Sequence, residues 1–152
     1  MAPMTEEQIY NRMMALCSRR EYCKGDIAAK IAALSENVDA GAMIEKLCAE
    51  KFIDDSRYAA AFVRDKSRLQ GWGGIKIRYA LQKKGIDKET IAEAMSQIDE
   101  NQQMERLTKL MKAKALTLKV TAAEDRRARL IRFAVSRGFT YAQADAVCKN
   151  IL

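Results

Sequence analysis

The stretch "KGIDKETIAEAM" (Lys84–Met95) predicts the end of one helix and the start of the next. Gly85 can adopt the left-handed backbone conformation that closes a helix. Asp87 can cap the helix that follows, and Ile91 and Met95 lie four residues apart, so they share one face of that helix. The stretch therefore predicts a tight corner between two packed helices.

The same corner recurs twice in the sequence. "RGFTYAQADAVC" (Arg137–Cys148) repeats its order of residues, and "NVDAGAMIEKLC" (Asn37–Cys48) is a fainter copy. Alignment of the three corners makes Val38, Ile86 and Phe139 equivalent, at offsets of 48 and 53 residues. A corner that returns at such spacings is typical of tandem arrays of small helical units.

The alignment also relates the helices on either side of each corner. Before the corner, it makes Ile31, Tyr79 and Arg132 equivalent. After the corner, a pair of residues four positions apart recurs in each unit: Met43 and Leu47, Ile91 and Met95, Ala144 and Cys148. This spacing predicts that each of these helices buries one face.

The composition favours helix throughout. The only proline is Pro3, and good helix formers such as Ala, Leu, Glu, Lys and Arg dominate. The predicted helices span residues 6–18, 24–34, 40–50, 55–69, 74–84, 88–98, 101–117, 122–137 and 141–151. The predicted fold is all-α: three tandem three-helix repeats, at 1–53, 54–99 and 100–152, in one elongated, curved, solenoid-like array.

Several helix starts carry a capping signature. The spacing of a capping box occurs at Thr5 with Gln8, Thr121 with Glu124, and Thr140 with Gln143. Cys23 and Asp26 stand where a fourth would be expected, although a thiol is a poor hydrogen-bond acceptor.

The composition argues against several classes of function. The sequence has no histidine, no P-loop and no dinucleotide-binding fingerprint, so we expect no enzyme activity, no metal site and no cofactor. No apolar run approaches 18 residues and the start lacks a signal-peptide pattern, so we expect a cytoplasmic protein without a membrane partner. The four cysteines are expected to be reduced, half-buried thiols: Cys17, Cys23, Cys48 and Cys148.

Positive charge is concentrated towards the C-terminus. Residues 1–53 hold 7 Lys or Arg and 8 Asp or Glu, residues 54–99 hold 9 and 7, and residues 100–152 hold 11 and 5. This asymmetry favours an acidic partner, either nucleic acid or an acidic protein surface, over a basic face that is merely solvated.

The first basic region is the predicted helix 55–69 and the segment after it. Tyr58, Phe62 and Leu69 are expected to face inward. Arg57, Arg64 and Arg68 recur at helical spacing and predict an outward stripe, which Lys76, Arg78, Lys83 and Lys84 extend around the next helix. Trp72 lies among glycines, where it is either an exposed aromatic contact for a partner or a lid packed over the seam between two repeats.

The second basic region is the predicted helix 122–137. Leu130, Phe133 and Ala134 are expected to face the core. Arg126, Arg127, Arg129 and Arg137 are expected to project outward, with Arg132 beside the seam and with Lys109, Lys112 and Lys114 on the preceding helix. Arginine suits bidentate contact with carboxylates or phosphates, although a solvated helix face is the alternative. The apolar stripe Leu107, Leu110, Met111 and Leu118 is expected to pack in the core.

Two segments carry a resemblance to a known family. "FIDDSRYAAAFVRDKSR" (52–68) followed by "IRYALQKKGID" (77–87) resembles the RecX family, bacterial regulators of the recombinase RecA. The matching positions are Ile53, Asp54, Asp55, Tyr58, Ala59, Phe62, Val63, Gly71, Gly73, Ile77, Leu81, Lys84, Gly85 and Ile86. The first repeat is similar through Leu16, Arg19, Arg20, Tyr22, Asp26, Ile27, Lys30 and Ile31. The chain departs from the family pattern at Cys23, Trp72 and Gly74.

The resemblance implies a non-enzymatic inhibitor. RecX-like proteins bind the RecA filament on single-stranded DNA, lie in its groove, and restrain ATP hydrolysis, strand exchange and co-protease activity. By this resemblance the partner is the RecA filament, with single-stranded DNA inside it as an open further contact, and the free protein is expected to be a monomer. The alternative function is a stand-alone basic helical protein that binds nucleic acid mainly through phosphates.

Overall fold

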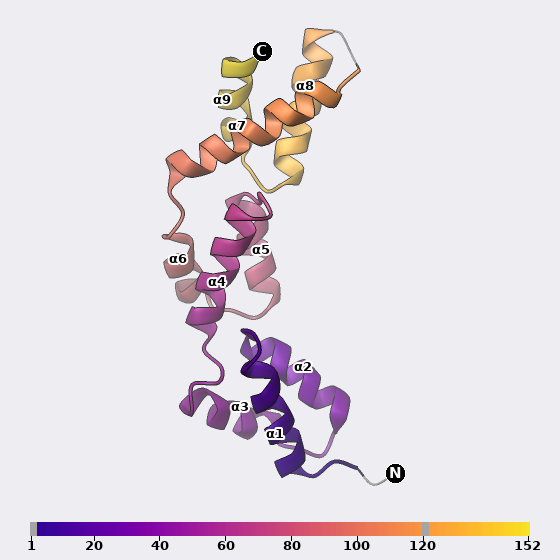
Figure 1. The fold of residues 1–152 in the computed structure, drawn as a ribbon, viewed down its shortest axis with the longest axis vertical. Coiled ribbons are helices and arrows are strands. Elements are labelled where there is room, and N and C mark those ends of the chain that lie inside the picture. The colour runs from indigo at the N-terminus through magenta and orange to yellow at the C-terminus, as the bar shows by residue number, and fades with distance from the viewer. Residues whose placement is uncertain (1–2, 120–121) are drawn as a thin grey trace.

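The structure is a computed structural model that describes residues 3–119 and 122–152. Its helices form an elongated, curved array that runs from the N-terminus at one end to the C-terminus at the other (Figure 1). The described residues contain nine helices and no strand: α1 (Glu6–Cys17), α2 (Lys24–Leu34), α3 (Ala40–Ala49), α4 (Asp55–Arg68), α5 (Gly74–Lys83), α6 (Lys88–Met95), α7 (Glu100–Thr117), α8 (Ala123–Ser136) and α9 (Tyr141–Ile151). The predicted fold class is confirmed.

Each group of three helices surrounds its own apolar core. The first core contains Ile9, Met13, Ile27, Ile31, Met43, Leu47 and Ile53. The second contains Tyr58, Ala59, Val63, Ile77, Leu81, Ile86, Ile91 and Ala94, together with Cys23 from the first group. The third contains Leu107, Met111, Leu130, Ile131, Ala134, Phe139, Ala144, Val147 and Cys148. The repeat boundaries at 53/54 and 99/100 stay a prediction.

The predicted corners have the expected backbone. Gly85 and Gly138 adopt positive φ angles of 79° and 97°, and each closes the helix before it. Ile86 and Phe139, the apolar residues of these two corners, are buried, whereas Val38 of the first corner is half-buried.

One part of the predicted alignment is wrong. Tyr79 is 58% exposed and Arg132 is exposed, so neither is equivalent to the buried Ile31. The buried equivalents of Ile31 are Leu81 and Ala134, each five residues before its corner residue. Ile31 lies seven residues before Val38, two more than in the other repeats: the loop between α2 and α3 is one residue longer, and α2 extends one residue further beyond Ile31.

The helix starts agree with the capping signatures where they are described. The capping boxes that begin at Thr5 and Thr140 are both present. The one predicted at Thr121 lies outside the described residues. Cys23 does cap α2: the Asp26 amide donates to its sulfur at 3.4 Å, and the Asp26 carboxylate accepts from the Cys23 amide at 3.5 Å. The Cys23 thiol therefore acts as the N-cap of α2, although thiols are poor hydrogen-bond acceptors.

The four cysteines are free thiols, two of them half-buried (Cys17 and Cys48) and two fully buried (Cys23 and Cys148). Burial raises the pKa of Cys23 to about 11, so this thiol is protonated at neutral pH.

No helix in residues 3–119 or 122–152 is both long and apolar enough to cross a bilayer.

The first seam joins α2 to the turn after α5. The Cys23 thiol lies 3.9 Å from the Lys84 carbonyl oxygen, and a Cβ on Gly25 would lie 2.5 Å from that oxygen. The Lys84 ammonium pairs with the Asp26 carboxylate at 2.6 Å across the seam. The corner that ends α5 is therefore the surface on which the first repeat docks.

The second seam uses the equivalent parts of the next two repeats. The amides of Gly73 and Ile75, at the start of α5, donate to the carbonyls of Arg137 and Gly138 at 2.7 and 3.0 Å. A Cβ on Gly73 would lie 2.4 Å from the Gly138 carbonyl group. The Arg137 guanidinium donates to the Gln70 carbonyl at 3.3 Å. In both seams, the start of the second helix of one repeat therefore packs against the corner of the next repeat: α2 against the corner at Gly85, and α5 against the corner at Gly138.

The Asp26–Lys84 pair gives the first seam a pH dependence. Burial alone raises the pKa of Asp26, but the hydrogen bonds from Lys84 and Cys23 outweigh it and hold the pKa below its usual 3.8. A lowered pKa in the folded state stabilises the fold above the unfolded pKa, and this stabilisation disappears as the pH falls through the folded pKa. We expect Asp26→Asn to cost about 1 kcal/mol at pH 7 and to be nearly neutral near pH 2.

Urea unfolding of both proteins between about pH 7 and pH 2 measures this difference. Asp65→Asn, a change at an exposed carboxylate on α4, serves as the control. A difference between Asp26→Asn and the wild type that stays constant over this range would show that the pair does not stabilise the seam.

Candidate partner-binding surface

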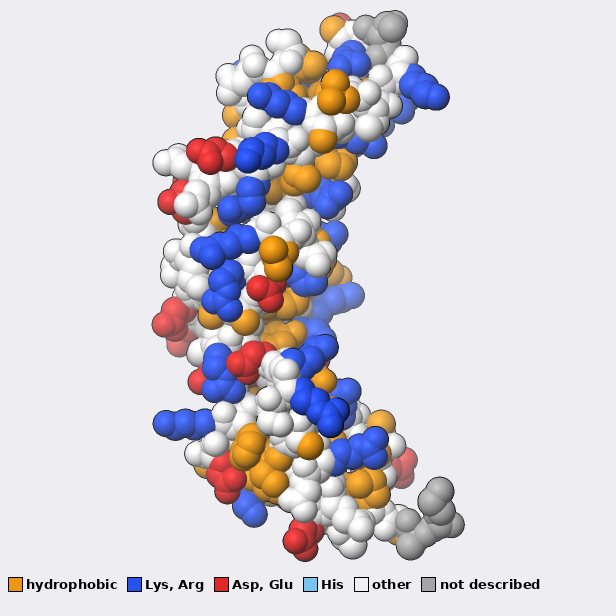
Figure 2. Space-filling view, viewed as in Figure 1, with side chains coloured by type: hydrophobic (Ala, Val, Ile, Leu, Met, Phe, Trp, Pro, Cys, Tyr) orange, Lys and Arg blue, Asp and Glu red, His pale blue; other side chains and the backbone are white. Residues whose placement is uncertain are grey.

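The second helix of every repeat lies on the concave side of the array. α2, α5 and α8 follow one another along the right side of Figure 1. We call this surface, with the turns at its two seams, the second-helix face. Its Lys and Arg residues are Lys24, Lys30, Lys76, Arg78, Lys83, Lys84, Arg126, Arg127, Arg129, Arg132 and Arg137. Basic side chains follow this edge of the molecule through its middle, with little acidic surface between them (Figure 2).

A basic hollow of about 470 Å³ opens at the first seam. Its lining consists of four cationic side chains, Arg20, Lys30, Lys83 and Lys84, together with Tyr22, Gly25, Asp26 and Ala29. The Arg20 guanidinium and the Lys30 ammonium lie 4.5 and 5.4 Å from the Tyr22 ring centroid. The one carboxylate, Asp26, is already paired with Lys84. Four cations and one carboxylate make this hollow attractive to an anion.

The sequence reasoning did not place Arg20, Tyr22 and Lys30 in the site. They stood among the residues that carried the family resemblance, yet a local pattern cannot show that they meet Lys83 and Lys84 from the next repeat. Tyr22 lies just before α2 and Lys30 lies within it, and this spacing was the only available indication that the two side chains could meet.

Trp72 lies at the second seam as a half-buried lid. Its ring meets Phe62 edge-on at a centroid distance of 6.2 Å and packs against the second core. The ammonium groups of Lys66 and Lys76 lie 4.7 and 4.4 Å from its centroid. The adjacent Gly73 amide is hydrogen-bonded across the seam. Of the two roles predicted for Trp72, a lid over the seam therefore fits this geometry better than a freely exposed contact. Its ring also holds two ammonium groups at the surface.

Trp72 is the only tryptophan, so its fluorescence reports on this cluster. The two nearby ammonium groups attract anions, so we expect iodide to quench the fluorescence more strongly than caesium at equal ionic strength. Changing both Lys66 and Lys76 to Gln is expected to remove most of this difference. Equal quenching of the wild type by both ions would contradict the arrangement.

The outer side of α5 combines exposed apolar and basic side chains. Ile75 and Tyr79 are 52% and 58% exposed and lie one turn apart. The Lys83 ammonium lies 5.1 Å from the Tyr79 ring centroid, and Arg78 is exposed beside them. Aromatic and apolar side chains surrounded by cations are typical of protein-binding surfaces. The sequence analysis named the basic residues of this helix but did not single out Ile75 or Tyr79 as exposed contacts.

The arginines of the third repeat fall into two groups. Arg127 forms an ion pair with Asp145 and donates to the Tyr141 hydroxyl at 3.2 Å, and these two hydrogen bonds raise the pKa of its guanidinium. Arg126 donates to the Ala115 carbonyl at 3.5 Å, and Arg137 ties the second seam. These three residues have intramolecular roles that the sequence did not predict, whereas Arg129 is exposed.

A second basic hollow, of about 590 Å³, lies between α7 and α8. It is lined by Lys114, Leu118, Arg129, Arg132, Phe133 and Ser136. The Arg137 guanidinium and the Lys114 ammonium lie 5.2 and 5.6 Å from the Phe133 centroid. Phe133 is therefore partly a platform for cations and not only a core residue. The predicted core residues Leu107 and Met111 are buried as expected.

The predicted stripe on α4 is only partly available to a partner. Arg57 is held in the first seam by the Glu21 carboxylate at 2.5 Å and by two backbone carbonyls. Arg64 and Arg68 are exposed. Leu69 was predicted to face inward, but it is 80% exposed because α4 ends at Arg68 and the chain turns away there. Lys112 is exposed on α7. The predicted site residues therefore do not form one patch.

The comparisons with known proteins agree with this architecture. Residues 54–95 match the family model described as RecX, second three-helix domain. A protein named Regulatory protein RecX from Clostridium botulinum (strain Alaska E43 / Type E3) is 38% identical over 92 residues, or 59% of this chain. One of the same name from Thermus thermophilus is 29% identical over 126 residues, covering 83% of this chain and 80% of that protein. The chain is therefore similar to RecX proteins, above all over residues 54–95. The match to the C. botulinum RecX spans only 42% of that protein's length.

A solved RecX structure has the same fold. The crystal structure of RecX from Lactobacillus salivarius superposes with a TM-score of 0.83 over 95% of both chains, at 21% sequence identity. The RecX model region, 54–95, contains eight of the predicted site residues: Arg57, Arg64, Arg68, Trp72, Lys76, Arg78, Lys83 and Lys84. The other five, Lys112, Arg126, Arg127, Arg129 and Arg137, lie outside it. The RecX relatives are named regulatory proteins.

Proposed function

We propose that this chain is a member of the RecX family and a non-enzymatic regulator that binds in the helical groove of the RecA filament on single-stranded DNA. In this role it inhibits RecA ATP hydrolysis, strand exchange and co-protease activity, and so acts in the cytoplasm on DNA repair and the SOS response. The observation that carries the proposal is the second-helix face, a concave, basic surface that runs past all three repeats. The similarity to RecX proteins supplies the identity of the proposed partner.

The shape of the array suits a groove in a polymer. A long, concave surface with contacts spread over three repeats can span several neighbouring subunits, which a single pocket cannot do. α5 lies at the middle of this surface and combines exposed Ile75 and Tyr79 with Arg78 and Lys83. We propose that α5 is the centre of the contact, because binding energy concentrates at central aromatic and arginine side chains.

The proposed contact residues follow from their exposure. On α5 we propose that the half-buried Lys76 joins Arg78 and Lys83. Beyond α5, we propose that Arg129 and Lys112 meet the partner directly, with Arg64 and Arg68 on the neighbouring α4 surface as further contacts. Trp72 contributes by positioning Lys66 and Lys76. Arg57, Lys84, Arg127 and Arg137 contribute mainly by holding the seams and the third repeat in shape.

A stand-alone nucleic-acid-binding protein is the second candidate. It is favoured by the basic hollow at the first seam, which four cations line and where two of them, Arg20 and Lys30, lie over the Tyr22 ring. Such a protein would bind single-stranded DNA through its phosphates, and its affinity would fall steeply as the salt concentration rises.

Titration of RecA ATP hydrolysis on single-stranded DNA separates the two functions. The affinity of the chain for the same DNA without RecA is measured in parallel, in the same buffer. We expect half-maximal inhibition at a concentration at least about ten-fold below the dissociation constant for naked DNA. Inhibition that follows DNA occupancy would support the second candidate, and no inhibition of a cognate RecA would refute the proposal.

A further inference from the structure

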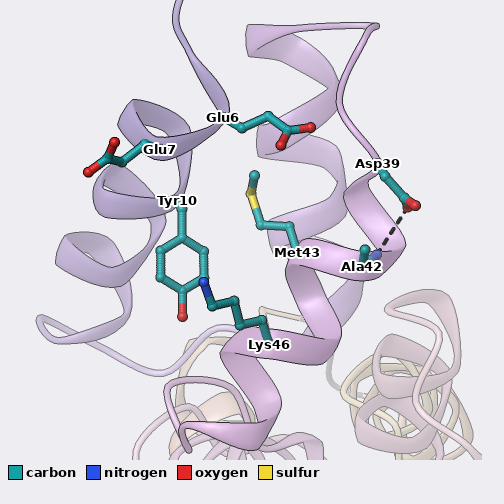
Figure 3. Close-up of a pocket in the computed structure, with 7 residues that line it drawn as sticks. All are labelled: Glu6, Glu7, Tyr10, Asp39, Ala42, Met43 and Lys46. Atoms are coloured by element: carbon teal, nitrogen blue, oxygen red, sulfur yellow. Dashed lines mark hydrogen bonds between the residues drawn. The ribbon is translucent and has the colours of Figure 1, made fainter.

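An acidic hollow of about 420 Å³ lies at the N-terminal end of the array, between α1 and α3. Its lining consists of Glu6, Glu7, Tyr10, Asp39, Ala42, Met43 and Lys46. Figure 3 shows Glu6 reaching across the opening above Met43, with the ring of Tyr10 along one side. The hollow therefore has an apolar floor and an acidic rim.

The acids of the rim are available to a cation from outside. Glu6 and Glu7 are exposed and form no ion pair with any cation in residues 3–119 or 122–152. Asp39 uses one carboxylate oxygen to cap α3, through the Ala42 amide at 3.0 Å. The only cation of the lining, Lys46, lies over the Tyr10 ring at 4.8 Å. The rim thus has an excess of negative charge.

The opposite end of the array carries a side chain with the complementary character. Leu116, in the last turn of α7, is 89% exposed, more than any other large apolar residue of the described chain. Lys112, one turn earlier, and Lys119, three residues later, are both exposed. Residues 109–119 and 122–129 together hold seven Lys or Arg and only two Asp or Glu. The tip is an apolar projection in a basic surface.

We propose that copies of this chain associate head to tail, with Leu116 of one copy inserted into the acidic hollow of the next. Lys112 and Lys119 would then face Glu6 and Glu7. The two surfaces lie at opposite ends of an elongated molecule (Figure 1), so Leu116 cannot reach the acidic hollow of its own chain. A contact between two different surfaces is heterologous, and when its geometry does not close a ring it forms open chains.

The contact is small, so we expect it to be weak in free solution. One apolar side chain and a few exposed ion pairs bury far less surface than a stable interface needs, so association is expected only at high protein concentration. The chain is then a monomer when dilute, and salt weakens the association because the ion pairs are exposed. This inference does not depend on the proposed function.

Sedimentation velocity of the full chain tests the proposal, from about 10 to 500 µM at low salt. Leu116→Asp removes the projection, and Ala42→Arg fills the hollow at an exposed position. Leu69→Asp is the matched control, since Leu69 is 80% exposed but lies at neither end. We expect the average sedimentation coefficient of the wild type and of Leu69→Asp to rise without a plateau, while both end variants remain monomeric.

Mixing the two end variants gives the sharpest result. The Leu116→Asp chain keeps an intact hollow and the Ala42→Arg chain keeps an intact projection, so an equimolar mixture is expected to form dimers and stop there. A wild type that stays monomeric at the highest concentration would overturn the proposal. So would a wild type that saturates as a dimer, end variants that assemble like the wild type, or a mixture without dimers.

Discussion

Replacing Gly73 with alanine is expected to lower the free energy of unfolding by about 3 kcal/mol, because the added Cβ meets backbone that cannot move aside. The Cβ would lie 2.4 Å from both the carbonyl carbon and the oxygen of Gly138, and 2.5 Å from the amide nitrogen of Phe139. Relief of this clash requires the second seam to open, which breaks the hydrogen bonds from Gly73 and Ile75. Urea unfolding followed by circular dichroism measures the change.

Two other glycines provide controls with different expected results. Gly85→Ala adds a Cβ to open space at a φ of 79°, so only backbone strain of about 1 kcal/mol is expected. Gly41→Ala lies inside α3 with nothing closer than 3.5 Å, and we expect a gain of about 0.5 kcal/mol in stability. If Gly73→Ala costs no more than Gly85→Ala, the second seam is not closely packed.

Loss of this seam should also be visible as a loss of cooperativity. In arrays of repeats, the unfolding of one unit is coupled to the next through their interface. We expect Gly73→Ala to unfold in two steps, with the third repeat separating from the first two. The single tryptophan, which lies beside this seam, would report the first of these steps by its fluorescence.

Reversing the charge of Arg78 is expected to raise the concentration needed for half-maximal inhibition of RecA by about ten-fold. Arg78 is exposed at the middle of the second-helix face, beside Ile75 and Tyr79. Truncation or reversal of a central interface arginine typically has an effect of this size. Thermal unfolding of Arg78→Glu should match that of the wild type, since the side chain is exposed on a helix surface. The ATPase titration on single-stranded DNA measures inhibition.

Lys88→Glu is the matched control for this prediction. It makes the same change in net charge, but Lys88 opens α6, on the other side of the array from α5 (Figure 1). We expect inhibition by Lys88→Glu to stay within about two-fold of the wild type. Equal losses in both variants would mean that net charge alone drives the binding, as for a non-specific contact with phosphates.

The fold was largely predictable because its rules are local. A helix corner needs a glycine, an apolar residue and a cap within a few positions, so the corners at Gly85 and Gly138 could be read from the sequence. The helix ends differ from the prediction by at most three residues, at α6, where Ser96 closes the helix. The register before the first corner could not be predicted, since it depends on a loop that is one residue longer and on a helix that extends one residue further.

The site was less predictable because it is assembled from different repeats. The hollow at the first seam brings Arg20 and Lys30 next to Lys83 and Lys84, and nothing in either segment indicates the other. Spacing also cannot distinguish a free arginine from a paired one. Arg127 and Arg129 both looked outward, but Arg127 meets Asp145, which lies on the next helix.

The exposure of Leu69 and Leu116 illustrates a related limit. Leu69 continues the apolar pattern of Tyr58 and Phe62, yet it lies just past the end of α4, where the chain leaves the core before the pattern stops. Leu116 lies outside the apolar stripe of α7, on the same face as Lys112. Hydrophobic periodicity predicts the buried face of a helix and not its last turn.

The most direct test of the central claim is a comparison of two affinities. Fluorescently labelled chain is titrated with RecA filaments on single-stranded DNA and, separately, with the same DNA alone, at physiological salt. Our account predicts binding to the filament at least about ten-fold tighter than to the naked DNA, and a weaker filament affinity for Arg78→Glu. Equal or tighter binding to the naked DNA would contradict it.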